Sequence, residues 1–144
     1  MIKGSFPVRL IRIRNYFLNM NTDVILKNLE RSCIIHGDAT ESGDYKTANK
    51  HHQIIIKSIL QLYNNGDLMK IENLLNHKNV SVKLWSAGML LPFRSSLCEK
   101  ILKEISKANG MVSFSAEITL QEWKKGTLKL PYKYKQSNRS RIDC

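Results

Sequence analysis

The residues His36, Asp38, His51 and His52 in the first half of the chain have side chains of the kinds that bind metal ions. Neighbouring side chains on a helix point about 100° apart, so His51 and His52 cannot easily bind one ion together. The i, i+4 spacing that metal-binding helices use is absent. The pattern therefore predicts no metal site, and we expect no cofactor.

Acid–base chemistry has a similarly weak basis in the sequence. Glu41 and Asp44 lie close to Lys46 and Lys50, but carboxylates near the start of a helix match its dipole, so we interpret them as helix-terminus charges. The chain has no nucleophile elbow, no phosphate-binding glycine loop and no HExxH motif. The sequence predicts that the protein is not an enzyme and shows no evident small-molecule substrate site.

The net charge of +11 is concentrated at the two ends of the 144-residue chain. Residues 1–19 carry four basic side chains and no acidic one, and residues 124–144 carry seven basic side chains against one acidic. Residues 20–123 are almost balanced, with twelve basic and eleven acidic side chains. Basic ends can attract phosphates or an acidic protein, or they can be solvated without a partner.

Cysteine usage and hydropathy bear on the cellular location. Cys33, Cys98 and Cys144 are odd in number and form no CxxC pair, which is typical of reduced thiols in a cytoplasmic protein. The longest apolar stretch, residues 87–91, is far shorter than the roughly 20 residues of a membrane-spanning helix. We therefore expect a cytoplasmic location and no membrane partner.

The chain divides into three parts. Residues 1–19 are interpreted as an N-terminal extension, either poorly ordered or preceding a functional start at Met20, which good N-cap residues follow. Residues 20–126 form the predicted helical domain. Residues 127–144 are interpreted as an extended, largely mobile basic tail, in which Tyr132 and Tyr134 are candidates for docking on the domain.

Apolar side chains at helical spacing predict six helices in the central domain. The expected helices cover about 22–41, 44–64, 67–76 and 80–91, a fifth that Ser95 or Ser96 caps, and 111–125. Asp67 is expected to cap the third helix, and Pro92, Gly110 and Gly126 mark helix ends. The predicted core contains Ile55, Ile59, Leu75, Val82, Trp85, Ala87, Ala116, Leu120 and Trp123.

A weak internal repeat connects two of these helices. The segment 85–91, which begins Trp-Ser-Ala and ends in Leu, matches the segment 114–120, which begins Phe-Ser-Ala and ends in Leu, at an offset of 29 residues. A helical hairpin cannot bury its apolar face alone, so neighbouring hairpins must stack. The fold class predicted is all-α, a short α–α superhelix of about three hairpins.

Four further patterns resemble one family. They are Asn49-Lys50 in the second helix, the Leu-Leu-x-His turn at 74–77, the Val-basic-x-Trp-x-Ala segment at 82–87, and Leu120 with Trp123, Gly126 and Leu128. In order and spacing they resemble a small bacterial all-helical family of HEAT or armadillo-like proteins of unknown function, over about residues 23–128. Lys83 and Ser86 depart from the family pattern, as do both chain ends. The resemblance implies an α–α superhelix without enzymatic activity, and for some relatives beside toxin genes it suggests an immunity role.

Helical-repeat proteins bind partners on an extended concave surface. We expect the second helix of each hairpin to form that surface, with Asn49, Lys50, Lys57, Lys83 and Lys124 as candidate partner-binding residues. Asn49 has an equally good interpretation as an inter-helix hydrogen-bonding residue. The favoured hypothesis is a non-catalytic module that binds an acidic protein, such as a toxin that it neutralises. A nucleic-acid-binding protein using a basic groove and tail is the alternative, and a structural or oligomer-forming role comes third.

Overall fold

The computed structural model describes the backbone of residues 8–135 and the side chains of residues 21–135, and every regular element in this range is helical. The elements are α1 (Val8–Ser42), α2 (Tyr45–Asn64), the 3-10 helix η1 (Leu68–Leu74), α3 (Val80–Leu90), α4 (Ser95–Ser106) and α5 (Met111–Lys125). The all-α fold class is confirmed. Residues 1–7 of the expected extension and 136–144 of the expected tail lie outside the described residues.

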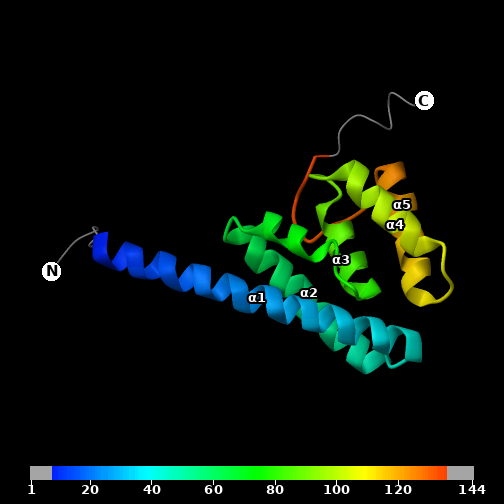
Figure 1. The fold of residues 1–144 in the computed structure, drawn as a ribbon, viewed down its shortest axis with the longest axis horizontal. Coiled ribbons are helices and arrows are strands. Elements are labelled where there is room, and N and C mark those ends of the chain that lie inside the picture. The colour runs from blue at the N-terminus through cyan, green and yellow to red at the C-terminus, as the bar shows by residue number, and fades with distance from the viewer. Residues whose placement is uncertain (1–7, 136–144) are drawn as a thin grey trace.

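The first helix starts earlier than the sequence analysis predicted. It begins at Val8 instead of near Thr22, and its N-terminal part runs out beyond the other helices (Figure 1). No glycine or proline occurs between Pro7 and Gly37, so nothing in the local sequence stops the helix. The Thr22 hydroxyl does not cap a helix, because it donates a 2.6 Å hydrogen bond to the Asp67 carboxylate, where η1 begins.

Two predicted helix starts use their polar residues differently. Asp67 precedes η1, but its side chain makes no capping bond, and the expected helix 67–76 is a shorter 3-10 helix. At the start of α4 neither serine is the cap; Arg94 holds that position, and the Ser95 hydroxyl donates to the Leu91 carbonyl. In both cases the side chain that the local pattern predicts as a cap forms a hydrogen bond with another segment of the chain instead.

The helix ends follow the sequence more closely. Gly66 and Gly126 adopt a φ of +77° just after α2 and α5, a left-handed conformation that glycine adopts without steric cost. At Gly126 the backbone N–H returns to the Glu122 and Trp123 carbonyls. Asp44 caps α2 by accepting a 3.2 Å hydrogen bond from the Thr47 N–H, as expected of a helix-terminus carboxylate.

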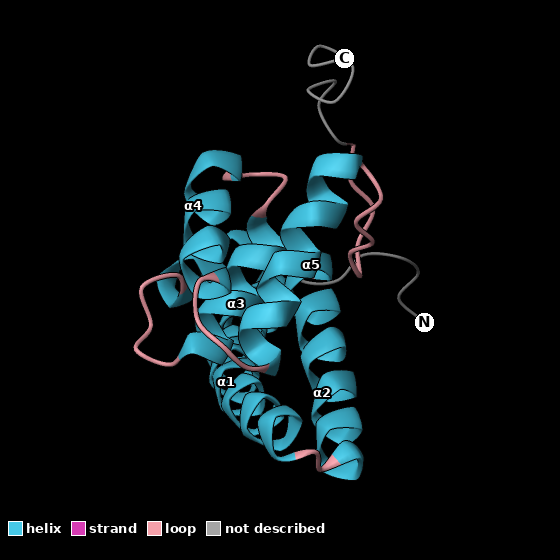
Figure 2. Cartoon of the chain, turned by 90° about the vertical axis from the view of Figure 1, so that its right-hand side faces the viewer, coloured by secondary structure: helices cyan, strands magenta, loops and turns pink. Residues whose placement is uncertain are grey.

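Packing places α3 at the centre of the molecule. The long helix α1 lies along α2, α4 lies along α5, and α3 contacts α1, η1, α4 and α5 (Figures 1 and 2). Eight of the nine predicted core residues are buried: Ile55, Ile59, Leu75, Val82, Ala87, Ala116, Leu120 and Trp123. Trp85 is half-buried: it packs against this core and also lines a cavity beside α2.

The first half of the predicted tail is packed on the helices. We call residues 127–135 the strap. Tyr132 is only 4% exposed, and its hydroxyl donates to the Met89 carbonyl at the end of α3. Apolar residues at 128, 130, 132 and 134 alternate with exposed lysines at 129, 133 and 135, so an extended chain turns one face to the helices. The expectation of a mobile tail is wrong for these residues, and the expected docking of Tyr132 and Tyr134 is confirmed.

Candidate functional site

A cavity of about 480 Å³ lies where the strap crosses the helices, and we call it the strap cavity. His52 and Ile56 of α2 line one side, four residues of α3 from Leu84 to Met89 line another, and Ser115 and Thr119 of α5 face them. Residues 128–131 of the strap complete the lining, together with His36 from α1. The cavity thus lies between α2, α3 and α5, the second helices of the three hairpins expected from the sequence.

Three rings form a cluster in the cavity wall. The His36 and His52 rings have centroids 5.4 and 5.6 Å from that of Trp85, both in edge-to-face orientation, and are 5.9 Å from each other. Burial lowers the pKa of His36, and electrostatic repulsion from the neighbouring His52 and His51 lowers it further. His36 is therefore mostly a neutral imidazole near pH 7, which suits its edge-to-face packing with the Trp85 indole.

The four residues considered for a metal site are separated by the fold. His36 and His52 meet at Trp85, whereas His51 points to α1, with its Nδ1 3.2 Å from the Ser32 hydroxyl. Asp38 is exposed. Within the described residues, no group of three or more histidine, cysteine, aspartate or glutamate side chains is arranged to hold a metal ion.

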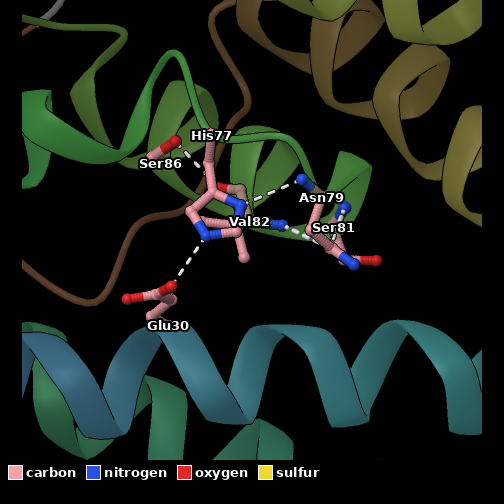
Figure 3. A network of polar contacts seen from close by, with 6 residues as sticks. All are labelled: Glu30, His77, Asn79, Ser81, Val82 and Ser86. Atoms are coloured by element: carbon pink, nitrogen blue, oxygen red, sulfur yellow. Dashed lines mark hydrogen bonds and ion pairs between the residues drawn. The ribbon is translucent and has the colours of Figure 1, made fainter.

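A polar network fixes the start of α3 and thereby the position of Trp85 (Figure 3). The Asn79 backbone N–H donates to His77 Nδ1 at 2.9 Å, so the ring proton is on Nε2, which donates to Glu30 at 2.7 Å. The Asn79 side chain accepts from the backbone N–H groups of Ser81 and Val82, which caps the helix. The Leu-Leu-x-His turn is therefore an anchor between α1 and α3.

The carboxylates of Glu41 and Asp44, where α1 ends and α2 begins, cap two different helices. Asp44 caps α2, and hydrogen bonds from Thr47 hold the pKa of its carboxyl below the usual range. Glu41 instead reaches the start of α5, where it accepts a 2.8 Å hydrogen bond from the Val112 N–H. Neither carboxylate faces the strap cavity, and the lining residues include no aspartate or glutamate.

The five candidate partner-binding residues are not gathered on one surface. Asn49, Lys50 and Lys57 are exposed on α2, and Lys57 borders a shallow depression that also includes His52. Lys83 lies on the side of α3 that faces α4, because its charge helps to lower the pKa of the Glu104 carboxyl on α4, after the larger contributions of Lys107 and Lys100. Lys83 does not line the strap cavity. Lys124 is exposed near the end of α5, and it does not line the cavity.

The described cysteines carry no reactive thiol. Cys33 and Cys98 are both free and buried. Burial raises the pKa of both thiols, that of Cys98 to about 12, so each stays protonated at neutral pH. They act as small apolar side chains in the core.

Sequence reasoning missed the ring cluster and the strap as parts of one site. The alternation of apolar residues and lysines over 128–135 is a signal that could have indicated a docked extended segment. His36, His52 and Trp85 are far apart in the sequence, so no local pattern connects them. Only the packing of α1, α2 and α3 brings these rings together.

Comparison with protein-family models, with curated proteins and with solved structures finds no significant match to this chain. None of the helices in the described range has the length and apolar character needed to cross a membrane.

Proposed function

We propose that the protein is a non-catalytic module that binds another protein, built as a short α–α superhelix of three hairpins: α1 with α2, η1 with α3, and α4 with α5. The position of the strap cavity between α2, α3 and α5 supports this arrangement, because stacked hairpins form their concave surface from equivalent helices. The resemblance to HEAT and armadillo-like proteins is part of the same proposal.

An exposed apolar stripe on α5 is the observation that carries the proposal. Met111, Phe114 and Ile118 have exposed fractions of 49%, 53% and 36%. Their i, i+3, i+7 spacing puts them on one face of the helix. Ser115 and Thr119, which line the strap cavity, come next around the helix, so the stripe borders the cavity. Contiguous exposed apolar side chains of this kind mark protein interaction sites.

The charges near the stripe suggest the character of the partner. Lys125 lies on the same face of α5, seven residues after Ile118, and the strap adds exposed lysines at 129, 133 and 135. A partner with an apolar centre and acidic residues around it would be complementary to this surface. A toxin neutralised by this protein, as the resemblance implies, is one partner of this type.

A nucleic-acid partner is the second candidate, and the strap is the observation that favours it. Its lysines at 129, 133 and 135 are all exposed and give this short segment a concentrated positive charge. Such a group of lysines can contact phosphates, with affinity that falls steeply as salt rises. This candidate does not use the apolar stripe on α5, which separates the two experimentally.

The test is capture from a lysate of the source cells by tagged protein, with and without nuclease, read by mass spectrometry. The variant Phe114→Ser with Ile118→Ser removes the stripe, and Leu97→Ser on α4 is the matched control, because Leu97 is similarly exposed. We expect a stoichiometric protein that survives nuclease, binds the control and is lost from the stripe variant. Equal capture by the stripe variant and the control would refute the proposed surface, and recovery of nucleic acid alone would favour the second candidate.

A further inference from the structure

The strap cavity has a chemical character of its own, separate from the exposed stripe. Its ionisable lining residues are His36, His52 and Lys129, all of them bases. The remaining lining is mostly apolar, including Trp85 on α3 and residues 128, 130 and 131 of the strap. A half-open, largely apolar cavity with basic groups and no carboxylate in its lining is complementary to an apolar anion.

The polar groups of the cavity have hydrogen-bonding capacity to spare. Among the described residues, no hydrogen bond uses the ring nitrogens of His36 or His52. The Ser115 and Thr119 hydroxyls donate to backbone carbonyls four residues earlier, at 2.9 and 2.8 Å, and keep their oxygen lone pairs for a ligand. Each of the two imidazoles offers at least one N–H to a ligand.

We propose that the strap cavity is a binding site for a small planar aromatic carboxylate. The aromatic ring of the ligand lies against Trp85 and the apolar strap residues, and its carboxylate accepts hydrogen bonds from His36 and His52, with Lys129 adding positive charge at the edge. The volume of about 480 Å³ is within the range of roughly 300–1,000 Å³ typical of small-molecule sites. Stacking of a ligand ring on the open face of the indole explains why the chain itself leaves Trp85 only half-buried.

The role of the strap follows from this assignment. Residues 128–131 form one wall of the cavity, and Tyr132 fixes them by its bond to the Met89 carbonyl and by stacking on Tyr63 at 5.1 Å. The strap therefore supplies both an apolar cover and a base to the site. The neighbouring His51, bonded to Ser32, faces away from the cavity and provides an internal control.

Isothermal titration of the full chain with 2-naphthoate tests the site, with the isosteric alcohol 2-naphthylmethanol as the uncharged probe. We expect naphthoate to bind at least tenfold more tightly than the alcohol. His52→Gln should remove most of this preference, because it takes away an imidazole that is exposed enough to be replaced without loss of folding. His51→Gln should leave the preference unchanged, and Trp85→Leu should weaken both probes.

The outcomes that would overturn the site are distinct. If naphthoate fails to bind, or binds no better than the alcohol, the proposed anion recognition is wrong. If His51→Gln reduces the preference as much as His52→Gln does, the effect is general electrostatics and not the cavity. Protein capture through α5 is measured separately, so failure of either proposal leaves the other testable.

Discussion

The docking of the strap makes a quantitative prediction about Tyr132. Its hydroxyl satisfies the Met89 carbonyl, one of the last carbonyls of α3, which has no partner within the helix. Its ring is buried and stacks on Tyr63 and Phe93, with centroids 5.1 and 6.1 Å away. Both the ring and the hydroxyl should therefore contribute to stability, and two substitutions separate them.

Tyr132→Phe keeps the ring and leaves the Met89 carbonyl unpaired, which should lower the free energy of unfolding by about 1–3 kcal/mol. Tyr132→Ala also removes the buried ring, for which about 3–5 kcal/mol is typical. Tyr132→Ala cannot destabilise the protein more than complete release of the strap does. The loss of stability in a chain that ends at Gly126 is therefore the maximum expected for Tyr132→Ala. Lys133→Ala is the matched control, because its side chain is exposed and should change stability by less than about 0.5 kcal/mol.

Equilibrium urea unfolding followed by circular dichroism at 222 nm measures these differences, provided that the transition is two-state. The order of stability expected is the wild type and Lys133→Ala, then Tyr132→Phe, then Tyr132→Ala. If Tyr132→Ala is as stable as Lys133→Ala, the strap is not docked, and the cavity that it closes does not exist as described.

Three further predictions concern the helices. Gly37→Ala places a Cβ 1.7 Å from the Ser81 hydroxyl oxygen and should lower the free energy of unfolding in urea by about 1–3 kcal/mol. Gly88→Ala is the control and should be tolerated, because its nearest neighbour from another element would be 3.8 Å away. Equal losses would contradict the close approach of α1 and α3. Burial lowers the pKa of His36, so the unfolded chain takes up the proton first and stability should fall as the pH drops below about 6.5. Melting temperatures at pH 7.5 and 5.5 should differ less in His36→Gln than in the wild type, and an identical difference would remove His36 as the cause. His77→Ala breaks the bond to α1 and should destabilise by about 1–3 kcal/mol in the same urea assay; an unchanged midpoint would show that the anchor contributes nothing.

Trp85 belongs both to the predicted core and to the lining of the strap cavity. The sequence places it in phase with Val82 and Met89, both of which are buried, and this periodicity alone predicts a core residue. In the structure the indole packs against the core, as predicted, and it also meets two imidazoles at the wall of a cavity. Its half-buried environment makes it a sensitive probe for the occupancy of that cavity.

Local chemistry determined most of the helical architecture. Stripes such as Ile55, Ile59 and Leu62 have the helical period and need a buried face, while Gly66 and Gly126 provide the left-handed conformations that end helices. These signals depend only on residues within a few positions of each other. For this reason the all-α class, the bounds of α2, α3 and α5, and nearly all of the predicted core were accessible from the sequence.

The contacts between distant segments were decided only by the tertiary structure. Thr22 and Asp67 are 45 residues apart, and their hydrogen bond redirects two side chains whose local patterns favour capping. The strap docks because its alternating apolar residues meet a surface that exists only after α3 and α5 have packed. The His36–His52–Trp85 cluster arises in the same way. A periodic pattern shows which face of a segment is buried, but the partner of that face is chosen by the packing of the whole chain.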